Sequence, residues 1–299
     1  MQAERRALML ALGAVLLWST VATAFKLALA DVTPRWLLAI AAMTSWVFLT
    51  AYLLWQKQLS QAWQALREQP LFYLRQALIN PLLYYLILFQ AYDLLPAQQA
   101  QSINYTWALT MSLLAVPMLG QALFGRDIVA LLLAYAGVVV IATRGNPMAL
   151  QFDSPLGVGL ALLSTVLWAL YWIWNTGGKH APHISLWCGF LLATPLIWLV
   201  ALVWDGWRAA NLMSQGGLAA IYVGLFEMGV TFLLWQTAMS TTQRTAAISS
   251  LIFLSPFLSL IFISQVLGEP IHPATFIGLV LIIVGLVIQK MPRRRQSAA

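Results

Sequence analysis

A single carboxylate lies in the middle of an apolar stretch that is long enough to cross a bilayer. Glu227 is flanked on both sides by the run Leu218–Ala238, LAAIYVGLFEMGVTFLLWQTA. A charged side chain in a membrane-spanning helix faces a protein interior or a water-filled cavity, because exposing it to lipid costs several kcal/mol. The sequence leaves three roles open for Glu227. It could bind a ligand's ammonium group, carry a proton, or lock its helix to a neighbour through a structural hydrogen bond.

Polar and aromatic side chains recur at helical spacing in several other apolar runs. Intervals of three or four residues place such side chains on one face of a helix. The recurring sets are Asn80 and Tyr84; Gln101, Tyr105, Ala108 and Ser112; Ser164, Trp168, Tyr171 or Trp172, and Asn175; Gly224, Glu227, Thr231 and Trp235; and Ser249, Ser250 and Phe253. A single hydroxyl often only returns a hydrogen bond to the preceding turn of its own helix. Several such faces together favour a cavity that binds a small ligand.

The positions of the tryptophans also favour a cavity that binds a small ligand. Tryptophans usually mark the membrane interface, but four of the fourteen lie near the middle of apolar runs: Trp18, Trp46, Trp107 and Trp168. Packing in an apolar core and lining of a binding site remain open for each of them. A ring-lined cavity suits a zwitterion with an apolar side chain, since Tyr and Trp stack on rings and face ammonium groups. The candidate ligand-binding residues are therefore Trp18, Asn80, Tyr84, Gln101, Tyr105, Trp107, Trp168, Trp172, Glu227, Trp235 and Ser250.

The sequence lacks the side-chain groupings that hydrolytic, covalent or metal chemistry requires. His180 and His183 share one loop, His272 lies in another, and the single Cys188 cannot build a disulfide framework or a thiol metal site. No Gly-x-Ser-x-Gly motif, no paired carboxylates within the apolar runs and no phosphate-binding glycine loop is present. We therefore expect a protein that is not an enzyme and that binds no cofactor and no metal.

Composition requires a membrane environment. The chain is 61% hydrophobic and only 8% charged, and it contains many apolar runs of bilayer length. This composition predicts an all-α polytopic membrane protein in contact with lipid, because the alternating segments of a transmembrane barrel are absent. The net charge of +7 does not indicate a nucleic-acid partner, since the basic residues lie in short loops and at the termini.

Ten membrane-spanning helices are predicted. Their expected bounds are Ala7–Ala30, Trp36–Trp55, Pro70–Tyr92, Ala97–Leu119, Ile128–Thr143, Leu156–Asn175, Ile184–Trp204, Gln215–Ala238, Thr245–Leu267 and His272–Lys290. The polar stretch Gln56–Gln69 is expected to lie at the membrane interface. On one side of the membrane the loops carry only Arg35, Arg144 and Arg208, whereas the other loops and both ends are rich in Lys and Arg. The positive-inside rule then predicts that both termini are cytoplasmic.

The two halves of the chain show weak internal similarity. LLWST at Leu16–Thr20 matches VLWAL at Val166–Leu170, and FQAYDLLPAQQA from Phe89 aligns without gaps with WQTAMSTTQRTA from Trp235. The fifth and tenth spans match around glycines. Because these matches occur in the same order, they predict a duplication into repeats 1–148 and 149–299. Since five spans is an odd number, the second repeat is inverted, which is the plan of secondary transporters.

These features resemble the drug/metabolite transporter superfamily with paired EamA-type repeats, over nearly the whole chain. The matching features are Trp18 and Lys26 in the first span, Pro256 in SLIFLSPFLSLIFISQVLGEP, and the Gly268-Glu269-Pro270 turn. The first repeat has Gly125-Arg126-Asp127 where the pattern has Gly-Glu. Within the superfamily, length and aromatic content are most similar to YddG-type aromatic amino acid exporters. The resemblance implies a ten-helix bundle that moves small organic metabolites outward.

We therefore expect a monomeric secondary transporter of the inner membrane that exports aromatic or other neutral amino acids by alternating access. Amphipathic drugs are the alternative cargo, and a membrane-embedded enzyme is the more distant one. Nucleotide sugars would need several basic groups for their phosphates, and only Lys26 lies at a suitable depth. Lys26 lies near the outer end of its span, where it could also extend to the interface. Without an ATP-binding motif, the energy source must be a gradient, and uniport and proton antiport both remain open.

Overall fold

Every regular element of the described chain is helical. The computed structural model describes residues 2–146, 148, 153–175 and 178–290. Within them, eight helices are long and apolar enough to cross a membrane: Gln2–Leu29, Pro34–Trp55, Pro70–Leu94, Gly125–Ala142, Pro155–Asn175, Pro182–Asp205, Gln215–Thr241 and Ala247–Leu267. The apolar helix Pro273–Gln289 is shorter. A helix satisfies its backbone hydrogen bonds internally, as the bilayer core demands. The predicted all-α membrane class is confirmed.

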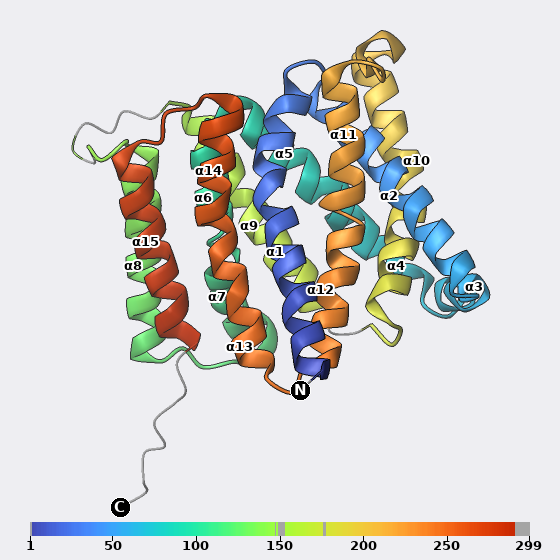
Figure 1. Cartoon of the computed structure of the whole chain (residues 1–299), viewed down its shortest axis with the longest axis horizontal. Coiled ribbons are helices and arrows are strands. Elements are labelled where there is room, and N and C mark those ends of the chain that lie inside the picture. Colours follow the sequence, from blue (N-terminus) through green and yellow to red (C-terminus); the bar gives the residue numbers. More distant parts are fainter. Residues whose placement is uncertain (1, 147, 149–152, 176–177, 291–299) are drawn as a thin grey trace, which may run out of the picture.

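The elements follow one another with short connections. In chain order they are α1 (Gln2–Leu29), α2 (Pro34–Trp55), α3 (Leu59–Glu68), α4 (Pro70–Ala77), η1 (Leu78–Leu83), α5 (Tyr84–Leu94), α6 (Ala97–Asn104), α7 (Trp107–Leu119), α8 (Gly125–Ala142), α9 (Pro155–Asn175), α10 (Pro182–Asp205), η2 (Trp207–Ala210), α11 (Gln215–Phe226), α12 (Val230–Thr241), α13 (Thr245–Ser250), η3 (Leu251–Leu254), α14 (Ser255–Leu267) and α15 (Pro273–Lys290). Successive long segments cross the bundle in alternating directions (Figure 1).

Four of the predicted spans are interrupted in the middle. Asn80 leaves helical geometry, with φ −140° and ψ 118°, just before Pro81, which has no N–H to donate. The stretch Ala97–Leu119 is divided into α6 and α7 at Tyr105, and α11 is separated from α12 by a turn that contains Glu227. The fourth interruption is the 3₁₀ segment η3, which directly follows Ser250. Each interruption thus contains or adjoins a residue that the sequence nominates for ligand binding.

The helices α8 and α15 form one end of the molecule, and α2, α3, α4 and α10 lie at the other end (Figure 1). Glycines allow α8 and α15 to approach closely. A Cβ atom on Gly137 would lie only 2.5 Å from the carbonyl oxygen of Gly278. Small residues at helix interfaces in membranes permit such backbone contact, and van der Waals packing then stabilises the pair.

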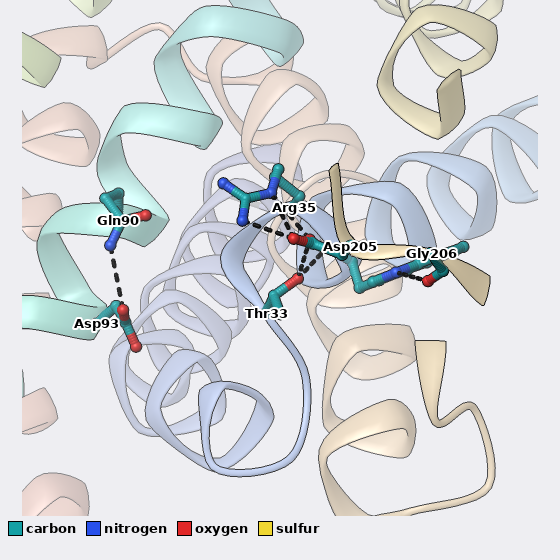
Figure 2. Close-up of polar contacts among 7 residues, drawn as sticks. Thr33, Arg35, Gln90, Asp93, Asp205 and Gly206 are labelled. Carbon is teal, nitrogen blue, oxygen red and sulfur yellow. Dashed lines mark hydrogen bonds and ion pairs between the residues drawn. The ribbon is translucent and has the colours of Figure 1, made fainter. Parts of the chain in front are cut away.

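At the opposite end, an ion pair fixes α2 to α10. Arg35 Nη2 lies 2.6 Å from Asp205 Oδ1, and Thr33 Oγ1 donates to Asp205 Oδ2 at 2.5 Å (Figure 2). The indole N–H of Trp36 donates to the Gly206 carbonyl at 3.0 Å. The Asp205 side chain is 7% exposed and the Arg35 side chain 31%, so the two helices are joined by a partly desolvated, charge-assisted contact. The predicted interfacial stretch forms α3, which packs on α10 through a Trp63–Trp187 ring contact of 5.3 Å.

Candidate binding site

Aromatic rings from five helices meet between the two halves of the chain. We call them the aromatic cluster: Trp18 of α1, Tyr84 of α5, Trp107 of α7, Trp168, Tyr171 and Trp172 of α9, and Phe232 and Trp235 of α12. At its centre, Trp168 stacks on Tyr84 with ring centroids 4.5 Å apart and on Tyr171 at 5.4 Å. Stacked and edge-to-face rings attract one another beyond the effect of burial alone.

Phe232 connects this centre to the first helix. Its ring centroid is 6.4 Å from that of Trp168 and 5.7 Å from that of Trp18, and Trp18 in turn lies 5.5 Å from Trp235. The structure therefore brings together six predicted site residues that are far apart in the sequence: Trp18, Tyr84, Trp107, Trp168, Trp172 and Trp235. Exposure rises from 9% at Trp168 to 37% at Trp172, so the cluster is buried at its centre and accessible at one edge.

Glu227 lies beside the aromatic cluster, in the turn between α11 and α12. Its Oε1 accepts a hydrogen bond from the Tyr85 hydroxyl at 3.1 Å, and the Tyr85 ring packs on Tyr84 at 4.7 Å. Its Oε2 is buried and has no hydrogen-bond partner among the described residues. No Lys or Arg side chain of the described chain forms an ion pair with Glu227. A buried carboxylate oxygen without a donor is costly, and either a bound ammonium group or a proton would remove that cost.

Amide and hydroxyl groups surround the remaining sides of the cluster. The Tyr84 hydroxyl lies 3.5 Å from Asn104 Oδ1, and Asn104 Nδ2 donates to Ser164 Oγ at 3.0 Å. These contacts join α5, α6 and α9. Asn80 and Gln101 are each 5% exposed, and each has a buried amide oxygen without a partner. A small cavity beside Tyr171 is lined by Gln76, Asn80, Pro81, Asn175, Ser185, Leu186, Gly189 and Phe190. Acceptor oxygens that lack donors favour a ligand that donates hydrogen bonds.

Two further predicted site residues differ in their placement. Tyr105 occupies the break between α6 and α7, packs partly buried against the main core, and lies close enough to Tyr84 and Glu227 to interact electrostatically with both. Ser250 is exposed at the end of α13, and its hydroxyl donates to the Ala247 carbonyl of the preceding turn at 2.7 Å. Neither side chain has a ring or hydrogen-bond contact with the aromatic cluster in the described contacts.

Three residues of the site were not predicted: Tyr85, Phe232 and Asn104. Tyr85 is adjacent to Tyr84 and lies outside the predicted stripe, yet its ring packs on Tyr84 and its hydroxyl donates to Glu227. The sequence feature that could have identified Tyr85 is the buried carboxylate of Glu227, which needs a hydrogen-bond donor from a neighbouring helix. Among the described residues, no group of three or more His, Cys, Asp or Glu side chains could hold a metal ion.

Comparison with known proteins defines the class of this one. The model of the EamA-like transporter family matches residues 5–143 and again 155–289. The chain belongs to this family, and it is a membrane transporter and not an enzyme. The predicted resemblance to this family is confirmed.

Individual relatives are more distant. The uncharacterized transporter YvbV of Bacillus subtilis (strain 168) is 27% identical over 239 residues, which cover 78% of this chain and 76% of that protein. The aromatic amino acid exporter YddG of Ancylobacter novellus is 23% identical over 225 residues, covering 71% and 73%. A solved structure, described only as the crystal structure of a protein, aligns with a TM-score of 0.66 at 22% identity over 98% of this chain and 99% of its own, which supports the fold.

Proposed function

We propose that this transporter exports aromatic and other neutral amino acids from the cytoplasm across the inner membrane by alternating access. The observation that supports the proposal is the aromatic cluster lying next to a carboxylate with one unpartnered buried oxygen. The substrate's side chain would stack in the cluster, and its ammonium group would bind Glu227. The name of the Ancylobacter relative, an aromatic amino acid exporter, agrees with this choice of cargo.

The binding mode follows from the chemistry of the lining. The accessible edge of the aromatic cluster, at Trp172, offers flat apolar ring surface, which suits an aromatic or branched side chain. The orphaned oxygens of Glu227, Asn80 and Gln101 are acceptors and would bind an ammonium group but repel a carboxylate. The amide nitrogens and tyrosine hydroxyls are the available donors for the substrate carboxylate, as no Lys or Arg contacts the cluster in the described contacts.

The same proposal assigns the architecture. The chain crosses the membrane ten times, as repeats 1–148 and 149–299 in opposite orientations, with α6 and α7 as the fourth crossing and α15 as the tenth. The breaks at Asn80 and Tyr105 lie in the third and fourth crossings, and those at Glu227 and Ser250 in the eighth and ninth. Interrupted helices in corresponding positions of two repeats are typical of transporter binding sites. The first turn of α1 and the last of α15 lie at one end of the bundle, which the basic loops assign to the cytoplasm (Figure 1).

Flux from liposomes tests the cargo. Vesicles that contain the purified protein are loaded with labelled phenylalanine, threonine or a cationic dye, and efflux is followed with and without a pH gradient. We expect phenylalanine efflux well above that of empty vesicles. At phenylalanine concentrations below the KM, efflux should be strongly reduced in Trp168→Ala and kept in Trp204→Ala, whose 70%-exposed ring lies far along α10. Efflux of the dye alone would reassign the protein as a drug exporter, and a response to the pH gradient would establish proton antiport.

A further inference from the structure

The turn between α5 and α6 is held by two opposite charges that come from different parts of the chain. Lys26 Nζ donates to the carbonyl oxygens of Tyr92 at 2.8 Å and Leu95 at 3.2 Å, at the end of α5. Glu269 accepts from the backbone N–H of Ala97 at 3.1 Å and of Gln98 at 3.4 Å, at the start of α6. Lys26 lies on α1, and Glu269 follows α14.

The sign of each charge matches the helix end that it contacts. The last carbonyls of a helix lack intrahelical donors and attract a cation, whereas the first amides lack acceptors and attract an anion. The α6 helix has no side-chain cap of its own, so Glu269 supplies the missing acceptor. Lys26 and Glu269 do not form an ion pair with each other; each acts on the turn that lies between them.

Gln98 completes the arrangement. Its side chain is 5% exposed, and its Nε2 donates to Glu269 Oε1 at 2.7 Å and to the Pro270 carbonyl at 3.0 Å. Its Oε1 accepts from the His272 N–H at 3.0 Å and from Thr275 Oγ1 at 2.7 Å. Every polar atom of this buried amide is therefore used to join α6 to the loop before α15, which fixes Glu269 against the helix start.

We propose that Lys26, Glu269 and Gln98 form a latch that closes the outer end of the substrate path, and that their release from the α5–α6 turn opens it. This inference rests on the proposed function, which assigns this end of the bundle to the outside and the path to the aromatic cluster. We call the three residues the outer latch. They are gating residues, which set access to the site without contacting the substrate.

The position of the latch relative to the helix breaks supports a gate. The segment from α5 to α6 is bounded by the break at Asn80 and the break at Tyr105, and Tyr84 and Asn104 lie at its two ends. Beneath the latch, Phe25 of α1 packs on Phe89 at 4.9 Å and on Tyr92 at 5.0 Å, which closes the path with rings. A segment with interruptions at both ends can move as a unit when its turn is released.

The end of the bundle that the proposed function assigns to the cytoplasm has a counterpart. Glu4 accepts from the Gln243 N–H at 2.7 Å and from Thr242 Oγ1 at 2.9 Å, at the turn between α12 and α13. In the gapless alignment from Phe89 and Trp235, Gln243 lies opposite Ala97, so both turns have an amide held by a carboxylate. The acidic residue of the first repeat's Gly-Arg-Asp motif does not contribute, because Asp127 accepts from the Phe124 N–H and so caps its own helix.

Accessibility of a cysteine beneath the latch tests this directly. Cys188 is replaced by Ser, and Thr23→Cys places a thiol one turn below Lys26, at a position that is 5% exposed. A membrane-impermeant thiol reagent is added outside intact cells. Because hydrogen bonds to charged groups are the strong ones, we expect Lys26→Gln and Glu269→Gln to raise the labelling rate roughly tenfold or more. Gln98→Leu removes the side-chain hydrogen bonds that fix Glu269, so it should raise the labelling rate as well.

The matched control is Asp93→Asn. Asp93 is an exposed carboxylate near the end of α5 that accepts a hydrogen bond from Gln90 of its own helix at 3.1 Å (Figure 2). It interacts electrostatically with Lys26 but bonds to neither helix end of the turn in the described contacts, so it controls for loss of a nearby negative charge. Its substitution should leave labelling unchanged. Unchanged labelling in all three latch variants, with each eluting as a monodisperse protein, would overturn the latch. Faster labelling from the cytoplasmic side only, measured in inside-out vesicles, would also overturn it.

A charge exchange separates the latch from a simple ion pair. In Lys26→Glu with Glu269→Lys, each charge would face the helix end of the wrong sign, so we expect labelling at least as fast as in the single variants. Recovery of the parent rate would show that the two charges pair directly, and would contradict the proposal. Labelling requires no cargo, so faster labelling without amino acid efflux would support the latch while removing the proposed substrate.

Discussion

Trp168 occupies the position where rings from α5, α7 and α12 meet, and its stacking partners fix its plane. A ring held on both faces is rigid, so a substrate that inserts beside it needs to order few protein side chains. The same rigidity makes its removal consequential, because neighbouring rings lose a stacking surface as well as a volume of packing.

Replacing Trp168 should weaken substrate binding more when the whole aromatic ring is removed than when a smaller ring remains. We expect Trp168→Ala to raise the KM for phenylalanine roughly tenfold, since stacked pairs contribute about 0.5–1.5 kcal/mol each, and Trp168→Phe to raise it much less. Efflux kinetics at varied internal phenylalanine measure both. Equal KM values for the two variants would contradict a stacking role.

Glu227 has two candidate functional roles, ammonium binding and proton transfer. They can be separated by comparing phenylalanine with its analogue that lacks the amino group. If its free oxygen binds the ammonium group, Glu227→Gln should reduce phenylalanine efflux about tenfold or more but spare the analogue that lacks the amino group. If Glu227 carries a proton, the variant should lose the response to a pH gradient for both compounds. Flux of both compounds should persist in Glu68→Gln, a control on α3. Unchanged phenylalanine flux in Glu227→Gln would leave only a structural hydrogen bond to Tyr85.

At the scale of elements, the contact of α8 with α15 depends on the absence of side chains. A Cβ on Gly137 would lie 2.5 Å from the Gly278 carbonyl oxygen and 3.1 Å from two side-chain carbons of α15. The two helices can therefore admit no larger residue at this point without separating. They lie at one end of the molecule (Figure 1), and neither helix contributes a ring to the aromatic cluster.

Gly137→Ala should therefore destabilise the protein by about 1–3 kcal/mol, the usual cost of overpacking a tight contact. Gly159→Ala is the matched control, because it makes the same change in the helix α9 where a Cβ would meet nothing within 4 Å. We expect it to be neutral or slightly stabilising. Thermal unfolding in detergent compares the two variants, and equal midpoints would show that the α8–α15 contact can relax.

The helices and their contacts also show which features could be predicted from the sequence and which could not. Apolar length identified the helices, because it depends on depth alone. Mid-span position indicated Trp18, Trp107 and Trp168, which join the aromatic cluster, but also Trp46, which has no ring contact with the cluster in the described contacts. The break at Tyr105 has no Gly or Pro beside it and could not be anticipated. The partners of Lys26 are backbone carbonyls of α5, and which carbonyls a lysine reaches depends on how helices pack. The expectation that Lys26 extends to the membrane interface did not predict its hydrogen bonds to these carbonyls.

At the scale of the whole molecule, the Arg35–Asp205 ion pair and the outer latch differ in the kind of segment that they hold. Arg35 and Asp205 join α2 to α10, two continuous helices that pack along each other (Figure 2). The outer latch instead holds a turn between two interrupted crossings. We therefore expect the Arg35–Asp205 ion pair to persist through the transport cycle and the outer latch to break in each turnover.

The orientation of the whole molecule is testable with two exposed positions. In a Cys188→Ser background, Met213→Cys lies in the connection before α11, where Met213 is 91% exposed, and Gln61→Cys lies on the exposed face of α3. The positive-inside rule predicts that an impermeant reagent labels the first in intact cells and the second only after lysis. The reverse pattern would place both termini outside and would invert the direction assigned to the latch.

The aromatic cluster also has an optical consequence. Five of the fourteen tryptophans belong to it: Trp18, Trp107, Trp168, Trp172 and Trp235. Rings this close exchange excitation energy, so a molecule that quenches or shields one of them alters the emission of the group. Light that excites tryptophan but not phenylalanine would then report occupancy by the substrate without a label. The protein carries its own fluorescent indicator at the place where its cargo is proposed to bind.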